Sequence, residues 1–553
     1  MNLARLQEAI AAAIPETECL IFGGRRYTWA QFNDRTRRLG AFLRQNGLGL
    51  HKELGRLENW QSSQDHVAMY LYNCNEYLET LLAAFKCRAS AINVNYRYQD
   101  DELVYLLKNS GAKAIVFHAR FAVMLASLRD QLPDIQVWIQ VADGSDVTLM
   151  AGAIDYEEAL AACAPEPIDP GCRDDDLFII YTGGTTGLPK GVLWRQTDIF
   201  FGLIAQTPVG TSQEKTVADV TRRVSQGRLG KAMPLAPMMH ASGTCMALGA
   251  MFRGSAIVIQ ETVDHFDAKE IVQTFERESI TQATLIGDAF AAPLLAEMDR
   301  GSYDLSAFSM INSGGAVLSP RNKKRLQDHM PQMLLVDAVG SSEAGRQAMN
   351  LSKGGKTKSS VDFEMDINAC VISADRTRIL QPGEDETGWV AQGEPVAMGY
   401  LNDAEKTKLA FPVIDGKRYA VPGDRARMNE DGSYHFLGRD SVTINSGGEK
   451  IFAEEVEHAL KTLSGILDAQ VVGVVDDIWG QKVVAIVSKT GEAEIDEQLV
   501  RDHCKSKLAD YKAPKNVIFV DELFRAANGK ASYEWARDLA NETLGTAQDG
   551  AGS

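Results

Sequence analysis

Short apolar runs alternate with stretches of helical periodicity along most of this 553-residue sequence. The runs 114–117, 177–181, 256–259 and 483–487 have the length of buried strands. The segment from Thr28 to Gln31 fits a capping box at the start of a helix. Alternating strands and helices favour mainly parallel sheets covered by helices, and the chain is too long for one compact core. We therefore predict an α/β fold with more than one domain.

The composition is that of a globular protein with an excess of acidic residues. Apolar residues make up 45% of the chain, and the formal net charge of −17 argues against non-specific nucleic-acid binding. No run reaches the roughly 18 apolar residues of a membrane-spanning helix, and the first residues lack a signal-peptide pattern. The 8 cysteines form no CxxC pair, which favours a reduced setting. We expect a cytoplasmic protein without nucleic-acid partners; peripheral membrane contact and oligomeric state stay open.

The segment from Tyr181 to Gly191 reads YTGGTTGLPKG and follows a strand-like run. Its glycines let a ligand approach the backbone closely, and its amide and hydroxyl groups offer donors to an anion. It is not a Walker A loop, because Pro189 precedes Lys190 and a glycine follows it. A Gly/Thr turn without a ligand remains the alternative for the cluster alone. The residues predicted to hold phosphate are Thr182, Gly183, Gly184, Thr185, Thr186, Gly187 and Lys190.

This string resembles the signature of the AMP-forming acyl-activating enzymes, which include acyl-CoA synthetases, luciferases and peptide-synthetase adenylation domains. The resemblance spans Tyr27 to Lys530, and further motifs follow in the family's order. Each short motif alone also fits an ordinary turn or surface segment, but the ordered set is far more specific. The motifs are PLAPMMHASG at 234–243, NSGGA at 312–316, DAVGSSE at 337–343, VPGD at 421–424, GRDS at 438–441, INSGGEKI at 444–451 and NGK at 528–530.

The resemblance implies a site for ATP and Mg²⁺. Lys530 would be the catalytic cation between a carboxylate and the α-phosphate, assisted by Thr182 and Lys190. Glu343 would act in catalysis and hold the metal, and Asp424 would accept hydrogen bonds from the ribose hydroxyls. The other residues implied to contact ATP or AMP are Gly314, Gly315, Ala316, Asp337, Ala338, Val339, Gly340, Ser341, Ser342 and Arg439.

The same resemblance places two further substrates, a carboxylic acid and coenzyme A. The implied acyl pocket contains His240, Ala241, Gly243, Gly314 and Gly340. The implied CoA-binding residues are Ser446, Gly447, Gly448, Glu449 and Lys450. This sequence departs from the family where Val339 replaces Tyr, where Ser441 and Val442 replace a Lys–Asp pair, and where Phe524 replaces Pro. The pivot between the domains is therefore open among Asp440, Ser441 and Val442.

The resemblance also implies a division of the chain and a two-step reaction. A large adenylation domain would span 1–439, a small mobile lid domain 440–545 and a disordered tail 546–553. A carboxylate and ATP would give acyl-AMP and pyrophosphate. Rotation of the small domain would then admit CoA, which gives acyl-CoA and AMP.

The sequence limits the identity of the carboxylic acid substrate only in part. Gly314, Gly340 and Ala344 are small and would leave room for a long or bulky acyl group. Strings such as VLWR at 192–195 and YAVPGD at 419–424 are similar to those of bacterial ligases for sterol side chains and other hydrophobic acids. We therefore expect a fatty or steroid acid. Three alternatives stay open: a stand-alone enzyme that loads a carrier protein, a non-catalytic nucleotide-binding relative, and luciferase-type oxidation.

Overall fold

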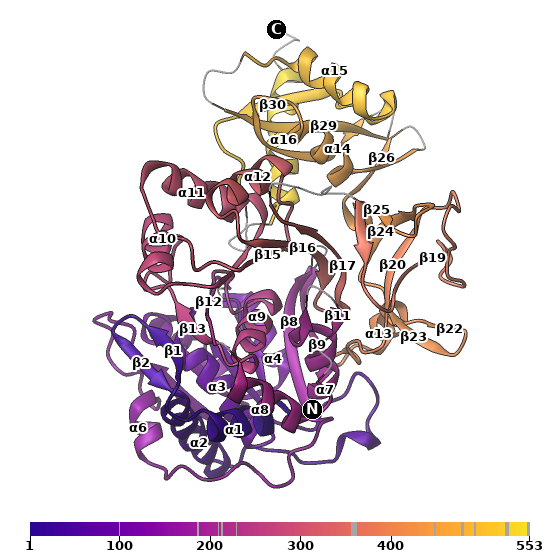
Figure 1. The fold of residues 1–553 in the computed structure, drawn as a ribbon. Helices are drawn as coiled ribbons and strands as arrows, with labels where there is room; N and C mark the ends of the chain where they lie inside the picture. The colour runs from indigo at the N-terminus through magenta and orange to yellow at the C-terminus, as the bar shows by residue number, and fades with distance from the viewer. Residues whose placement is uncertain are drawn as a thin grey trace.

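The computed structural model describes residues 1–98, 100–184, 187–207, 210–211, 214–227, 229–354, 362–446, 449–476, 480–490, 494–525 and 530–549. These residues form three large sheets and the helices that cover them (Figure 1). All eight cysteines are free and buried. Within these ranges, no helix combines the length and the apolar character needed to span a membrane.

The first large sheet has eight strands in the order β21-β9-β8-β4-β3-β5-β6-β7. Strands β8, β4, β3, β5, β6 and β7 pair in parallel, as the alternating pattern predicts. Strands β8 and β9 form an antiparallel hairpin that carries the predicted phosphate segment. The bounds are β3 (His66–Tyr70), β4 (Ser90–Asn93), β5 (Ala112–His118), β6 (Val137–Val141), β7 (Ile154–Asp155), β8 (Leu177–Gly184), β9 (Gly187–Arg195) and β21 (Gly399–Tyr400).

Helices cover this sheet and bury most of its apolar side chains. Helix α2 (Trp29–Gln45) begins with the predicted capping box: the Gln31 backbone N–H donates to Thr28 Oγ1 at 3.3 Å, and the Thr28 N–H donates to Gln31 Oε1 at 2.9 Å. Helix α3 (Asn75–Lys86) is buried along its whole length, because α1 and α2 pack over it. The other bounds are α1 (Leu3–Ala13), α4 (Asp100–Ser110), α5 (Ala122–Leu128), α6 (Tyr156–Ala161), α7 (Gln196–Ile199) and α8 (Val217–Gln226).

The second sheet has fifteen strands and changes character along its width. Strands β1, β13, β12, β14, β15 and β16 are parallel, whereas the pairs from β16 and β17 onward are antiparallel. The parallel part is β1 (Glu18–Phe22), β12 (Lys231–Pro234), β13 (Ala256–Ile259), β14 (Gln282–Leu285), β15 (Met310–Gly314) and β16 (Leu334–Ser341), with β2 (Arg25–Thr28) antiparallel at its edge. Its helices are α9 (Ala241–Phe252), α10 (Ala268–Arg277), α11 (Gly287–Arg300) and α12 (Pro320–His329).

The antiparallel part of this sheet lies to the right in Figure 1, drawn in orange beyond β17. Because most of its strands follow one another without an intervening helix, their order could not be predicted from strand–helix alternation. The bounds are β17 (Gly345–Ser352), β18 (Asp362–Met365), β19 (Ala369–Ile372), β20 (Gly388–Gly393), β22 (Val413–Ile414), β23 (Lys417–Ala420), β24 (Asp424–Met428) and β25 (Tyr434–Arg439), with α13 (Ala404–Ala410) beside β21.

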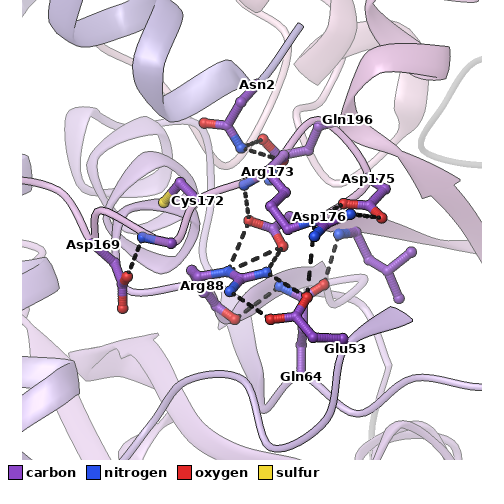
Figure 2. Close-up of polar contacts among 12 residues, drawn as sticks. Asn2, Glu53, Gln64, Arg88, Asp169, Cys172, Arg173, Asp175, Asp176 and Gln196 are labelled. Atoms are coloured by element: carbon purple, nitrogen blue, oxygen red, sulfur yellow. Dashed lines mark hydrogen bonds and ion pairs between the residues drawn. The ribbon is translucent and has the colours of Figure 1, made fainter. Parts of the chain in front are cut away.

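A polar cluster joins distant parts of the chain near the start of β8 (Figure 2). Arg88 donates to Asp176 through Nε and through Nη2, the latter at 2.7 Å from Oδ1. The same guanidinium reaches Glu53 at 3.3 Å. Nearby, Asn2 Nδ2 donates to Gln196 Oε1 at 2.9 Å, which fixes the start of α1. None of these residues was predicted to belong to the site, and their bonds to one another point to a structural role.

The third sheet belongs to the small unit at the top of Figure 1, drawn in yellow. Its apolar core is its own and includes Val456, Val471, Val483 and Val487. The bounds are β26 (Thr443–Ser446), β27 (Glu449–Phe452), β28 (Ile466–Asp476), β29 (Gly480–Lys489), β30 (Asn516–Val520), α14 (Ala453–Lys461), α15 (Glu497–Lys507) and α16 (Tyr533–Asp549). A short turn at 440–442 connects β25 to this unit.

The predicted disordered tail, 546–553, begins where helix α16 (Tyr533–Asp549) is still described. Helix α16 continues to Asp549. Ala536 and Ala540 anchor the helix against the small sheet. Once a helix has formed, each added turn costs far less than starting a new one. Residues 550–553 lie outside the described part of the chain.

Candidate active site

The predicted phosphate segment forms the tip of the β8–β9 hairpin. Thr182 pairs with Lys190 across the hairpin, and Gly184 pairs with Gly187. Gly183 lies on β8 beside them. A side chain at Gly191 would come within 2.9 Å of the Tyr181 ring, which explains the glycine there. Thr185 and Thr186 lie outside the described residues.

Lys190 is linked to Glu343 through a tyrosine that the sequence did not single out. Lys190 Nζ lies 5.1 Å from the ring centroid of Tyr400, and the Tyr400 hydroxyl donates to Glu343 Oε1 at 2.8 Å. Burial and the Glu343 charge raise the pKa of Tyr400, so its hydroxyl stays protonated and remains a donor. Tyr400 lies 57 residues from Glu343 in sequence, and no local pattern connects the two.

Asp424 and Arg439 face each other across the antiparallel strands β24 and β25. Arg439 Nε lies 3.3 Å from Asp424 Oδ1, and the Asp424 side chain is only 5% exposed. Burial raises the pKa of Asp424, whereas Arg439 and Lys530 favour its ionised form. The aspartate charge in turn raises the pKa of Arg439. A carboxylate held beside two cations can accept hydrogen bonds from a diol.

The Lys530 side chain lies close to Asp424 and Arg439, although Lys530 belongs to the small C-terminal unit. Its Cε lies 3.8 Å from where a Cβ on Gly315 would stand. The side chain stays accessible to solvent, yet protein groups crowd around it. This crowding and the Arg439 charge lower the pKa of Lys530, while Glu343 and Asp424 oppose the change. The structure thus brings Lys530, Asp424, Arg439 and Glu343 to one place.

The predicted adenine-side segments lie at the carboxyl ends of two parallel strands. Gly314 on β15 is in register with Ala338 on β16, and a Cβ on Gly314 would stand 3.2 Å from the Ala338 carbonyl oxygen. Gly315 has a φ of +82°, which favours glycine, and Ala316 follows it. The carboxyl ends of parallel strands are the usual ligand-binding edge of open α/β sheets.

The rest of the segment 337–342 is engaged within the protein. The Asp337 carboxylate is buried and lies 2.6 Å from Lys323 Nζ. Val339 packs against the apolar cluster around Phe363. Ser341 Oγ accepts the Ala344 N–H at 3.1 Å, and the Ser342 carbonyl accepts the Trp194 indole N–H at 2.8 Å. The side chains of Asp337 and Val339 are thus held by protein contacts, whereas the bond at Ser342 uses its backbone carbonyl and not its hydroxyl.

His240 stands at the start of α9, directly before Ala241. Its Nε2 is buried and has no hydrogen-bond partner among the described residues. Burial, with the charges of Lys530 and Arg97, lowers the pKa of His240 to about 3. The imidazole is therefore neutral at pH 7. A buried, unpaired ring nitrogen near Lys530 is the kind of group that contacts a substrate.

Two predicted pocket glycines have a packing explanation. A side chain at Gly243 would collide with the carbonyl oxygens of Pro237 and Ala236, and one at Gly340 would collide with the backbone of Gly345. The inference that Gly340 is small to make room for an acyl group is therefore weakened, because local backbone contacts alone require glycine there.

The predicted CoA-binding segment is the β26–β27 hairpin of the small unit. Ser446 pairs with Glu449, and Asn445 pairs with Lys450. Ser446 also pairs with Gly480 on β29. Gly447 and Gly448 lie outside the described residues.

The junction between the two parts of the chain is tightly packed. The Arg439 backbone N–H donates to Glu454 Oε2 at 3.1 Å. Gly438 has a φ of +106°, and a side chain there would collide with Glu454. Burial raises the pKa of Glu454 to about 8, with Glu457 and Asp424 adding to the rise. Helix α14 of the small unit is thereby held against the end of β25.

Comparison with known proteins gives matches along nearly the whole chain. A family model described as AMP-binding enzyme matches residues 7–401, and one described as AMP-binding enzyme C-terminal domain matches residues 455–530. The chain is 43% identical to the medium-chain acyl-CoA ligase Mig of Mycobacterium avium, over 96% of this chain and 97% of that protein. It is 35% identical to the 3-oxocholest-4-en-26-oate–CoA ligase of Rhodococcus rhodochrous, over 97% and 96%.

Solved structures share the fold at lower sequence identity. The anthranilate CoA ligase AuaEII in complex with anthranoyl-AMP has a TM-score of 0.79 at 19% identity, covering 99% of this chain and 98% of that one. ATP-bound MatB from Rhodopseudomonas palustris has a TM-score of 0.77 at 21% identity, covering 98% and 100%.

Proposed function

Because this chain belongs to the AMP-binding enzyme family, we propose that Lys530, Glu343, Asp424 and Arg439 form its adenylation centre. The protein is an ATP-dependent acid–CoA ligase that uses Mg²⁺. The observation that carries the proposal is the position of Lys530. It comes from the small C-terminal unit, yet it lies against Gly315 and among the charged groups of the large one.

In the first half-reaction a carboxylate attacks the α-phosphate of ATP, and both groups are negative. Lys530 offsets their repulsion and stabilises the charge that builds up on the phosphorus centre. Asp424 accepts hydrogen bonds from the ribose diol, and the Arg439 charge favours the ionised form of Asp424 against the burial that raises its pKa. The products of this step are acyl-AMP and pyrophosphate.

Glu343 fits the demands of Mg²⁺, which proteins commonly bind through one or two carboxylates together with phosphate oxygens. The Tyr400 hydroxyl fixes one of its carboxylate oxygens at 2.8 Å and so orients the group. When bound, Mg²⁺ would supply positive charge to the phosphates. Lys190, held over the Tyr400 ring, would add a further charge to the pyrophosphate leaving group.

In the second half-reaction the thiol of CoA displaces AMP. We place the pivot in the turn at 440–442, which joins the large domain at 1–439 to the small domain from 440 onward. Rotation there would remove Lys530 and bring the hairpin from Ser446 to Lys450 towards the acyl-AMP. Glu454 holds the present arrangement closed through its bond to the Arg439 N–H.

For the acid, we propose a hydrophobic monocarboxylic acid, with a medium-chain fatty acid first and a steroid acid second. The relative at 43% identity is named for medium-chain acyl groups, and that at 35% for a steroid acid. Neutral His240 supports this choice, because it offers no positive charge to a second carboxylate.

A pyrophosphate-release screen tests the proposal. Fatty acids of graded length, a steroid acid, aromatic acids and amino acids are each supplied with ATP and Mg²⁺. We expect the largest acid-dependent release with medium-chain fatty acids, and acyl-CoA formation when CoA is added. A preference for amino acids, or transfer to a carrier protein with none to CoA, would overturn it.

A further inference from the structure

Asn93 bonds to the backbone of two segments that flank the proposed reaction centre, one in strand β8 and one after strand β12. It is the last residue of β4 and is 6% exposed. Its Oδ1 accepts the backbone N–H of Tyr181 at 2.7 Å, and its Nδ2 donates to the Tyr181 carbonyl at 2.7 Å. The same Nδ2 also donates to the carbonyl of Met239.

The two bonded residues directly precede two candidate functional groups. Tyr181 precedes Thr182 at the start of the phosphate segment, and Met239 precedes His240. Tyr181 belongs to the eight-stranded sheet, whereas Met239 follows β12 of the fifteen-stranded sheet. A single side-chain amide therefore joins strand β8 of one sheet to the segment that follows strand β12 of another.

The side-chain amide of Asn93 hydrogen-bonds through both its nitrogen and its oxygen. A primary amide has two N–H donors, and each bonds to one carbonyl. A shorter or apolar side chain would leave two buried carbonyls and one buried N–H without this partner, so the two segments would shift to find others.

We propose that Asn93 is a positioning residue that sets the distance between the phosphate segment and the acid-side loop, residues 235–240. It thereby aligns the attacking carboxylate with the α-phosphate. The inference rests on the proposed adenylation centre, and Asn93 itself touches neither substrate. Alignment matters most when two separate reactants must meet, because a misplacement of about 1 Å can lower a rate about 100-fold.

Asn73 provides a matched control. It is also a buried asparagine, 5% exposed, and it also bonds to the acid-side loop. Its Oδ1 accepts the Met238 N–H at 2.7 Å, and its Nδ2 donates to the Ala236 carbonyl at 3.4 Å. Among the described residues these bonds reach the acid-side loop alone, whereas Asn93 also bonds to Tyr181.

The test measures the two half-reactions separately in Asn93→Ala, Asn93→Asp and Asn73→Ala. Asn93→Asp keeps the side-chain shape and serves if the alanine variant does not fold. We expect both Asn93 variants to lower kcat for acyl-AMP formation about 100-fold. Thioester formation from supplied acyl-AMP should change by less than about fivefold, because the acyl and phosphoryl groups are then already joined.

For Asn73→Ala we expect a higher KM for the acid with kcat for adenylation nearly unchanged. Equal losses in both half-reactions for the Asn93 variants, or the same kinetic pattern in Asn73→Ala, would overturn the inference. Adenylation at the wild-type rate in the Asn93 variants would also overturn it. A wild-type enzyme that releases no pyrophosphate with any acid would instead overturn the proposed function, so the two failures are distinguishable.

Discussion

Arg88–Asp176 and Arg439–Asp424 are both arginine–aspartate pairs with a buried carboxylate, but they differ in how fully they are bonded. Arg88 donates to both Asp176 oxygens, and one of those oxygens also accepts the Arg173 backbone N–H at 2.9 Å. Arg439 makes one looser contact at 3.3 Å, and its side chain is 34% exposed. The first pair has its bonding capacity filled by protein, while the second keeps capacity for a ligand.

The difference shows why residue type does not reveal function in this fold. A fully bonded pair holds the chain together, and breaking it leaves a buried charge without its partner. A partly bonded pair at a domain junction, with Lys530 nearby, can exchange solvent for substrate. Changing the Arg88–Asp176 pair should therefore lower stability, whereas changing the Arg439–Asp424 pair should lower activity.

Arg88→Ala should have the largest effect, and it should fall on stability. Removing the guanidinium leaves Asp176 buried and unpaired, which should cost about 3–5 kcal/mol of unfolding free energy. Denaturant unfolding measures this loss. Arg173→Ala is the control, because its bond to Asp175 is exposed and its unfolding midpoint should not move. An unchanged midpoint for Arg88→Ala would break the comparison.

Asp424→Asn should act on activity instead. The amide keeps the shape of the side chain but loses its charge, so we expect adenylation to fall about 100-fold. Its unfolding midpoint should stay close to that of the wild type, since a buried charge is removed without a cavity. Pyrophosphate exchange and denaturant unfolding on the same samples separate the two effects. A variant that unfolds easily but keeps its rate would reverse the assignment.

Tyr400→Phe should also act on activity rather than on stability, but with a smaller effect than Asp424→Asn. It removes one hydrogen bond to the Glu343 carboxylate, which corresponds to about a tenfold loss of adenylation rate. We also expect half-saturation by Mg²⁺ to require a higher concentration. Tyr419→Phe on strand β23 is the control and should change neither quantity. Equal Mg²⁺ dependence in the wild type and in Tyr400→Phe would contradict the role given to Glu343.

Glu454→Gln should change how stability depends on pH. Burial raises the pKa of Glu454 to about 8. The native protein therefore holds a proton that the unfolded chain, with a glutamate pKa of about 4.3, releases. Stability should fall as pH rises from about 4.3 towards 8, and Glu454→Gln should remove part of that fall. Unfolding midpoints of the wild type and of Glu454→Gln across this pH range measure the difference. If the two midpoints change with pH in the same way, Glu454 does not contribute.

Local features of the structure were predictable from the sequence, whereas contacts between distant segments were not. The capping box at Thr28, strand β5 at 112–118 and strand β13 at 256–259 were all predicted, because each depends on neighbouring residues. The antiparallel part of the fifteen-stranded sheet was not, since periodicity carries no information on strand order.

The candidate site divides in the same way. Family motifs in the sequence identified four candidate residues, which the structure brings together: Lys530, Asp424, Arg439 and Glu343. Tyr400 and Asn93 escaped prediction, because each acts through a residue that is remote in sequence. Gly340 was read as space for an acyl group, but a glycine in a sequence does not reveal which atom excludes its Cβ.

The most direct test of the account is the pair of half-reactions in Lys530→Ala, with Lys507→Ala, an exposed lysine of α15, as the control. We expect acyl-AMP formation to fall about 1,000-fold, because the cation between the two anions is lost. Thioester formation from supplied acyl-AMP should stay near the wild-type rate, because the proposed rotation would remove Lys530 before that step. Lys507→Ala should match the wild type in both. Equal loss of both half-reactions in Lys530→Ala would contradict the account.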